Sequence, residues 1–158
     1  MMPMRYLYTI LIFFLVSCSS AEITHLNLVP RSNTSTSTSK VQRMEMHLSA
    51  FGVESARFPS IDVYIDFSAD SSYCRKSYYD PKYKDSVYRL SKAEMLIIAS
   101  LIEKSDLSKL KKEYSVSKTD QPSSKTIIYF SNNTLQFNDY GLEADYPLPE
   151  LYKIVYKY

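Results

Sequence analysis

Two stretches of the chain alternate apolar and polar residues over the length of a β-strand. Between Ile61 and Phe67, every second residue is Ile, Val or Phe, and the residues between them are Asp or Tyr. The same alternation, with Met, Leu and Ala as the apolar residues, occurs between Met44 and Ala50. Successive side chains of a strand point to opposite faces of a sheet. Each stretch therefore predicts a strand with one buried and one solvated face, and the fold must cover the buried face.

Two other stretches carry the signals of helices that supply this cover. Ser91 and Glu94 form a capping box, in which each side chain accepts a free amide at a helix start. The helix expected over residues 92–104 has apolar residues on more than one stripe, so we expect it to be largely buried against the sheet. A last helix follows Pro147, with Leu, Ile and Val spaced along one face.

Shorter apolar runs complete the predicted fold. Further strands are expected at residues 73–79 and 86–90, and a hairpin joins strands at residues 125–130 and 134–138. The order along the chain is strands, helix, strands, helix. We predict an α+β fold over residues 41–158, a small antiparallel sheet with two helices packed on one face.

The first 17 residues have the plan of a secretory leader. Arg5 is the only charged residue before an apolar run from Tyr6 to Val16. This run has about eleven residues, whereas a helix needs roughly twenty to cross a bilayer. It therefore predicts a signal peptide rather than a membrane span.

The apolar run ends in the residues Leu-Val-Ser-Cys at positions 15–18. This motif resembles the lipobox of bacterial lipoproteins. The resemblance implies that Cys18 carries a diacylglycerol and fatty acyl chains such as palmitate, and becomes the first residue of the mature chain. It places the protein on a membrane of the cell envelope, and Ser19 after the cysteine implies the outer membrane in a Gram-negative bacterium. The alternative is an ordinary signal peptide that happens to contain Cys18. Residues 18–40 are rich in Ser and Thr and predict a flexible tether.

Charge and cysteine content narrow the classes of function. The formal net charge is +2, and removal of the leader would leave +1. A near-neutral chain gives no electrostatic reason to expect nucleic acid as a partner. With Cys18 in the anchor, Cys74 stands alone, and no internal disulfide is expected. We expect Cys74 to be buried; the alternatives are a bond to another molecule or a reactive thiol.

The sequence predicts no cofactor, metal or catalytic site. His25 and His47 each lack a second ligand at metal spacing. The only glycines are Gly52 and Gly141, which leaves no Gly-flanked nucleophile and no Gly-rich phosphate loop. Without a recognisable nucleophile and base, we do not expect an enzyme.

Tyrosine is the one residue type in excess, with fifteen in the chain. Five tyrosines lie among Lys and Arg residues between the clearest strand and the first helix. These candidate binding residues are Tyr73, Tyr78, Tyr79, Tyr83 and Tyr88. Tyrosine supplies a large contact area at low entropic cost, which suits a protein or glycan surface. The alternative is that these rings pack into or cap the sheet.

Two functions follow from these patterns. The first is an envelope lipoprotein whose domain binds a protein or glycan partner without catalysis, through the Tyr-rich segment or an exposed sheet edge. The alternative is a hydrolase of an envelope polymer that uses dispersed carboxylates as acid or base. The candidate carboxylates are Asp62, Asp66, Asp120 and Asp139. On one strand, Asp62 and Asp66 would lie about 13 Å apart, which favours a solvated sheet face. Nothing in the sequence indicates an oligomeric state.

Residues 44–158 also resemble a bacterial exported domain of unknown function. The resemblance is carried by residues 119–124, by the Asp-Tyr-Gly motif at positions 139–141, by the strand after Pro59 and by the closing helix after Leu148. Members usually carry two cysteines before the proline that matches Pro59, and residues 50–58 contain none. No redox or metal role therefore follows from the resemblance. Since the family has no assigned activity, it implies a fold rather than a function.

Overall fold

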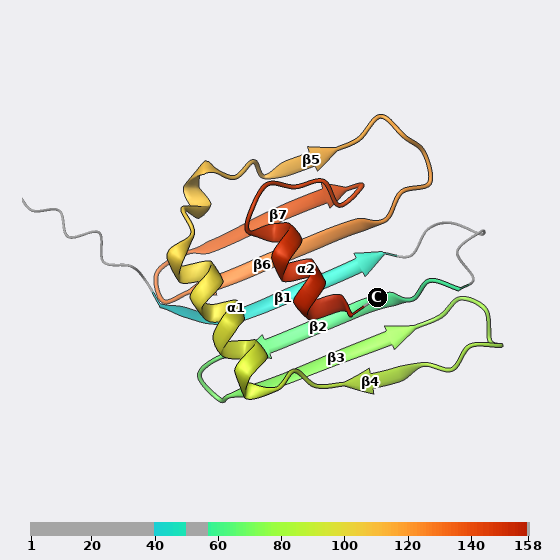
Figure 1. Cartoon of the computed structure of the whole chain (residues 1–158), viewed down its shortest axis with the longest axis horizontal. Coiled ribbons are helices and arrows are strands. Elements are labelled where there is room, and N and C mark those ends of the chain that lie inside the picture. Colours follow the sequence, from blue (N-terminus) through green and yellow to red (C-terminus); the bar gives the residue numbers. More distant parts are fainter. Residues whose placement is uncertain (1–39, 50–56, 158) are drawn as a thin grey trace, which may run out of the picture. The chain divides into compact units, whose positions relative to one another are not determined.

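The computed structural model describes residues 40–49 and 57–157. The predicted leader, Cys18 and all but the last residue of the predicted tether lie outside these residues. The elements are β1 (Val41–Ser49), β2 (Ser60–Asp66), β3 (Ser71–Ser77), β4 (Ser86–Tyr88), α1 (Lys92–Lys104), the 3₁₀ turn η2 (Leu107–Lys109), β5 (Glu113–Ser115), β6 (Ser123–Phe130), β7 (Thr134–Tyr140) and α2 (Leu148–Tyr156). Figure 1 shows the strands side by side in one sheet, with α1 and α2 lying across it.

The sheet has seven strands in the order β4-β3-β2-β1-β6-β7-β5. β1 lies at the centre and pairs antiparallel with β2 on one side and with β6 on the other. β2 pairs with β3, β3 with β4 and β6 with β7, all antiparallel. β5 pairs with β7 in parallel, so the sheet is mixed.

The predicted fold class, a small antiparallel sheet with two helices packed on one face, is wrong. The sheet dominates the described residues: it has seven strands, one pair is parallel, and two α-helices accompany it there. The missed strand, β5, has three residues and no alternation to reveal it. The connection from β5 to β7 runs through β6 and its flanking loops, and such a long connection is what permits a parallel pair.

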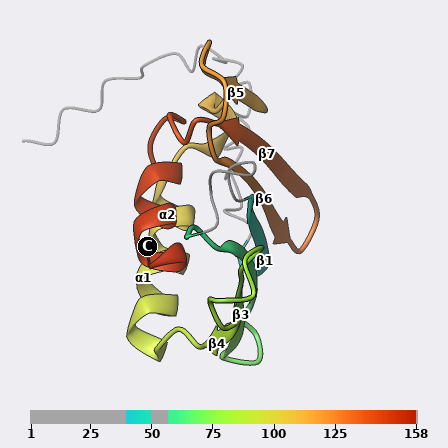
Figure 2. The same cartoon turned by 90° about the vertical axis from the view of Figure 1, so that its right-hand side faces the viewer.

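The hydrophobic core lies between one face of the sheet and the two helices. Alternate residues of β1 and β2 point into it, and Met44 and Ile65 are completely buried. From α1 the buried side chains are Met95, Ile98 and Ile102. α2 contributes Leu148, Leu151, Tyr152, Val155 and Tyr156. Figure 2, a view along the sheet, shows both helices on this side and no helix on the other.

The expectation that α1 is largely buried is also wrong. Its second apolar stripe faces away from the sheet, where Leu96 is 62% exposed and Ile97 55% exposed. The helix is therefore apolar on a side that no described residue covers.

The start of α1 is held by the predicted capping box. The Ser91 amide donates to Glu94 Oε2 over 2.6 Å, and the Glu94 amide donates to Ser91 Oγ over 3.2 Å. The other carboxylate oxygen of Glu94 lies 2.7 Å from Lys157 Nζ, just after the end of α2. The Lys157 ammonium, together with the Ser91 amide, lowers the pKa of Glu94 to about 2. One carboxylate thus joins the start of α1 to the end of α2.

The C-terminal end of α2 is held by β3 and β4. Tyr88 Oη donates to the carbonyl of Val155 over 2.5 Å, and Lys76 Nζ donates to the carbonyl of Lys157 over 2.9 Å. These carbonyls have no partner within the helix, so donors from the sheet satisfy them. Lys76 also brings a positive charge to the negative end of the helix dipole.

We predict that Glu94→Gln destabilises the domain by about 1 kcal/mol at neutral pH, because the cap and the link to Lys157 both weaken. The folded chain keeps Glu94 ionised to a lower pH than the unfolded chain does, so its contribution to stability is lost as the pH falls from 4.5 towards 2. Urea unfolding at several pH values should show that the free energy of unfolding falls less in the variant than in the wild type as the pH is lowered. Glu103→Gln, an exposed change on the same helix, is the control. An equal fall in the free energy of unfolding with pH in the wild type and the Glu94 variant would contradict a stabilising role of the ionised Glu94 side chain.

Candidate functional site

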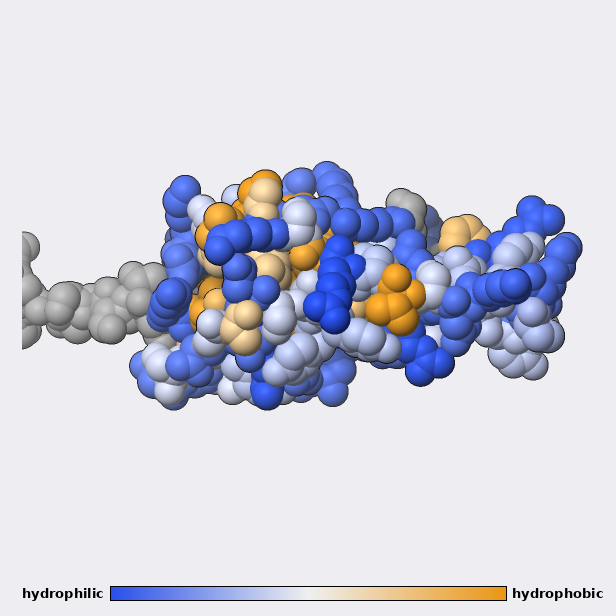
Figure 3. Space-filling view, turned by 90° about the horizontal axis from the view of Figure 1, so that it is seen from below, coloured by the Kyte–Doolittle hydropathy of each residue, from blue (hydrophilic) through white to orange (hydrophobic). Residues whose placement is uncertain are grey.

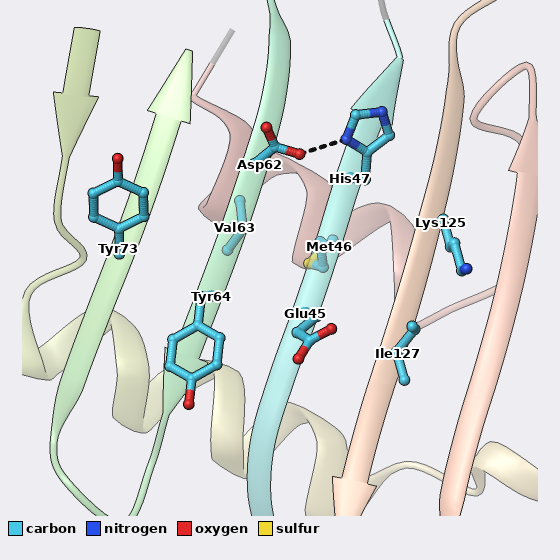
Figure 4. Close-up of a pocket in the computed structure, with 9 residues that line it drawn as sticks. All are labelled: Glu45, Met46, His47, Asp62, Val63, Tyr64, Tyr73, Lys125 and Ile127. Carbon is cyan, nitrogen blue, oxygen red and sulfur yellow. Dashed lines mark hydrogen bonds and ion pairs between the residues drawn. The ribbon is translucent and has the colours of Figure 1, made fainter. Parts of the chain in front are cut away.

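The face of the sheet opposite the helices carries a shallow depression of about 320 Å³. It lies over the central strands β1 and β2 and their neighbours β3 and β6, and Figure 4 shows its lining. The lining residues are Glu45, Met46, His47, Asp62, Val63, Tyr64, Tyr73, Lys125 and Ile127. We call this surface the open face, because no described helix covers it (Figure 2).

Charged residues form a row across one end of the open face. The strand register places His47 opposite Asp62 and Asp62 opposite Arg75. His47 Nδ1 lies 2.6 Å from Asp62 Oδ1, and Arg75 Nη2 donates to Asp85 Oδ2 over 3.0 Å. Hydrogen bonding from Arg75 lowers the pKa of Asp85. Lys125 lies opposite His47 on β6, and its ammonium makes no ion pair with a described residue.

Aromatic and aliphatic residues form the next row. Tyr73 is opposite Tyr64, Tyr64 is opposite Glu45, and Glu45 is opposite Ile127. The two tyrosines remain accessible, with 46% of Tyr73 and 38% of Tyr64 exposed. Cross-strand neighbours on one face lie about 5 Å apart, so the rings and Ile127 form one platform around Glu45.

A stacked arginine closes the other side of this platform. The guanidinium carbon of Arg43 lies 3.9 Å from the ring centroid of Tyr129 and 5.8 Å from that of Tyr64. Arg43 Nε lies 3.4 Å from Glu45 Oε1, and Tyr129 Oη donates to Glu45 Oε2 over 3.3 Å. Hydrogen bonding with Tyr129 is the main cause that raises the pKa of Arg43. These contacts hold Arg43 and Tyr129 in place beside Tyr64. They also give the Glu45 carboxylate an ion-pair partner and a hydrogen-bond donor.

The open face therefore presents accessible rings among groups that are paired with one another, together with the Lys125 ammonium, which makes no ion pair with a described residue. Arg43 with Glu45 and Arg75 with Asp85 each bring opposite charges together, and the His47 ring contacts the Asp62 carboxylate. Such a surface offers apolar contact area and hydrogen-bonding groups without demanding a highly charged ligand. Among the described residues, no group of three or more His, Cys, Asp or Glu side chains is placed to hold a metal ion. No helix in the same residues is long and apolar enough to cross a membrane.

The five predicted binding tyrosines do not share one surface. Tyr73 lies on the open face. Tyr78 and Tyr83 lie in the connection between β3 and β4, where their ring centroids are 5.5 Å apart. Tyr79, in the same connection, is 81% exposed. Tyr88 points to the helix side and holds the end of α2.

The four predicted carboxylates are separated by the sheet. Asp62 lies on the open face, whereas Asp139 is buried on the helix side, where its oxygens accept the amides of residues 143 and 144 over 3.1 and 3.0 Å. Asp66 accepts the amides of residues 68 and 69 and so stabilises a turn. Asp120 is exposed in the loop before β6. The structure therefore does not bring Asp139 to the side of the sheet where Asp62 lies.

The two short motifs that carry the resemblance to an exported domain contact each other. The amide of Gln121 donates to Tyr140 Oη over 3.2 Å, and the amide of Gly141 donates to the carbonyl of Pro122 over 2.8 Å. Asp139, the first residue of the second motif, caps the turn that follows. Both motifs thus build the corner where β6 and β7 meet the loop before β6, and their role here is structural.

The expectation that Cys74 is buried is confirmed. Its side chain is completely buried on β3, and burial raises the pKa of the thiol to about 11. The protonated thiol is a poor nucleophile.

Sequence reasoning missed Tyr64, Glu45, Lys125 and Ile127 as members of one site. The alternation of β1 and β2 does assign Glu45 and Tyr64 to the polar face of their strands. Nothing local in the sequence shows that β6 pairs with β1, and this pairing brings Lys125 and Ile127 to the depression.

Comparison of the chain with models of known protein families, with curated proteins and with solved structures found no match. The resemblance of residues 44–158 to an exported domain and that of the Cys18 motif to a lipobox therefore stay predictions.

We predict that Gly141→Ala destabilises the domain by about 2 kcal/mol, because the site requires a left-handed backbone and has no room for a side chain. The φ angle of Gly141 is +105°, and an added Cβ would lie 2.6 Å from Val116 Cγ2. Urea unfolding of the two proteins gives the difference in free energy. Adding Val116→Ala should recover only part of the loss, since it relieves the contact and leaves the backbone strain. Equal stability of Gly141→Ala and the wild type would contradict the prediction.

Proposed function

We propose that this protein is a lipoprotein of the cell envelope whose domain binds a protein or glycan partner without catalysis, and that the open face is its binding surface. The observation that carries the proposal is the platform of Tyr64, Tyr73 and Ile127 within the depression. Binding surfaces are enriched in Tyr, which combines a large apolar area with a hydroxyl.

The pairing of charges on the open face supports binding of a ligand without high net charge. The side chains of these ion pairs are all more than a third exposed, so a partner would not need to neutralise a deeply buried charge. Hydrogen-bonding groups remain at the rim, with the Tyr64 and Tyr73 side chains partly exposed and Lys125 in the lining. A neutral glycan chain or the polar surface of a protein has the chemistry that this arrangement fits.

Strand addition at a sheet edge is a weaker basis for binding. Both edge strands, β4 and β5, have only three residues. Short edge strands offer few free backbone groups to an added strand, and they are a common protection against such pairing. The open face therefore carries the proposal in place of an edge.

We predict that the double variant Tyr64→Ala, Tyr73→Ala loses partner binding by roughly fivefold or more, as expected when central aromatic contacts are removed. Crosslinking and co-purification of the full chain from its native envelope would test a protein partner, and sedimentation with isolated envelope glycan would test a glycan. Tyr79→Ala is the matched control, because this tyrosine is exposed away from the depression. Equal recovery of the partner by the double variant and the wild type would rule out the open face.

We predict that Cys18→Ala abolishes incorporation of labelled palmitate, because the acylated thiol is removed. The variant should leave the membrane fraction or remain unprocessed, as a chain without its acyl groups loses about 0.8 kcal/mol of membrane affinity for each buried methylene. Cys74→Ala is the control, since this buried cysteine should not affect labelling. Unchanged lipid labelling of Cys18→Ala would refute the anchor.

A further inference from the structure

The outward side of α1 carries an exposed apolar patch that the open face does not include. Leu96, Ile97 and Leu101 lie on this side of the helix, and Tyr146 approaches from the loop before α2. Leu96 is 62% exposed, Ile97 55% and Tyr146 64%. Together with Ser100 and Lys104 they line a shallow groove of about 350 Å³. Figure 3 shows hydrophobic side chains gathered on the surface where α1 lies.

Two lysines flank this apolar patch. Lys104, in the last turn of α1, lines the groove and makes no ion pair with a described residue. Lys111 lies outside the groove lining: its amide donates to Tyr114 Oη over 3.0 Å, and Tyr114 Oη donates over 3.2 Å to Oδ2 of Asp145, the residue before Tyr146. The Lys111 ammonium lies over the ring of Tyr114, 5.9 Å from its centroid. The patch is therefore apolar at its centre with the Lys104 ammonium at its rim, and Lys111 is linked through Tyr114 to the Asp145 carboxylate beside Tyr146.

This combination is that of a surface that lies on a lipid bilayer. Exposed Leu and Ile side chains enter the boundary of the acyl chains, Tyr is favoured at the level of the headgroups, and Lys is attracted to anionic lipids. A second copy of the chain is the other candidate occupant, and a stable complex of that kind would bury roughly 800 Å² on each partner.

We propose that the patch on α1, formed by Leu96, Ile97, Leu101 and Tyr146 with Lys104 and Lys111, docks the domain onto an anionic bilayer surface. This inference rests on the proposed anchor at Cys18, because the patch alone would bind a bilayer too weakly. Even a fully extended chain from Cys18 to Val41 spans only about 75 Å, so an anchored domain stays close to the membrane. A patch too small to bind a bilayer from solution is then sufficient to orient the domain, because the effective concentration is high.

The test uses the full acylated chain reconstituted into vesicles, with an environment-sensitive fluorophore on Ile97→Cys. Acylation blocks the Cys18 thiol and burial protects Cys74, so the label is directed to position 97. Val87→Cys, on the other side of the sheet and 56% exposed, is the matched control. Vesicles of phosphatidylcholine alone are compared with vesicles that contain about 30% phosphatidylglycerol, and nitroxide lipids serve as quenchers.

We expect quenching at position 97 to exceed quenching at position 87 by roughly threefold in the anionic vesicles, with a blue-shifted emission only at position 97. Charge reversal by Lys104→Glu with Lys111→Glu should lower the equilibrium constant for docking by roughly fivefold for each lysine. Lys84→Glu with Lys118→Glu changes the net charge equally at exposed sites elsewhere and should have a much smaller effect.

Three outcomes would overturn the proposal. Equal quenching at positions 97 and 87 in protein that floats with the vesicles would show an anchored domain without docking. Equal effects of the two charge reversals would show a general charge effect rather than a docking patch. A blue shift of the emission at position 97 that depends on protein concentration and not on lipid would assign the patch to contact with a second copy of the chain. Failure of the protein to float with vesicles would instead reject the anchor, and so separates the proposed function from this inference.

Discussion

The pairing of β1 with both β2 and β6 is the constraint on which the rest of the structure depends. β1 brings together a strand that follows it closely and one that lies some eighty residues further along the chain. Because side chains alternate between faces, this register decides which residues enter the core and which reach solvent. A slip of one residue would turn Met44 and Met46 outward and bury Glu45 and His47. The helices pack only on the face that this register makes apolar.

The same register arranges the opposite face for contact. Rows of residues run across the strands, one with His47, Asp62, Arg75 and Lys125 and one with Tyr64, Tyr73 and Ile127. The rings of Tyr64 and Tyr73 remain accessible beside these groups. Such a face suits contact with a partner, and it is built by strands, which hold side chains more rigidly than loops do.

The two proposed surfaces lie on opposite sides of the domain. The patch on α1 faces away from the sheet, and the open face lies beyond the sheet on the other side (Figure 2). A domain that rests on a bilayer through α1 would thus turn the open face away from the lipid and towards a partner. An apolar stripe on the outside of a helix costs solubility unless something covers it, and in the proposed arrangement the membrane would supply that cover.

The sequence by itself determined the local features of this protein. The alternation in β1 and β2, the capping box at Ser91 and the burial of Cys74 all follow from short-range patterns. Tertiary structure alone decided the size and mixed character of the sheet, the exposure of the second stripe of α1 and the meeting of Tyr64 with Lys125 and Ile127 in one depression. The tertiary structure also places Tyr88 against α2 and Tyr73 on the open face. The reason is that pairing between distant strands depends on the packing of the whole chain, whereas periodicity reports only which side of an element is apolar.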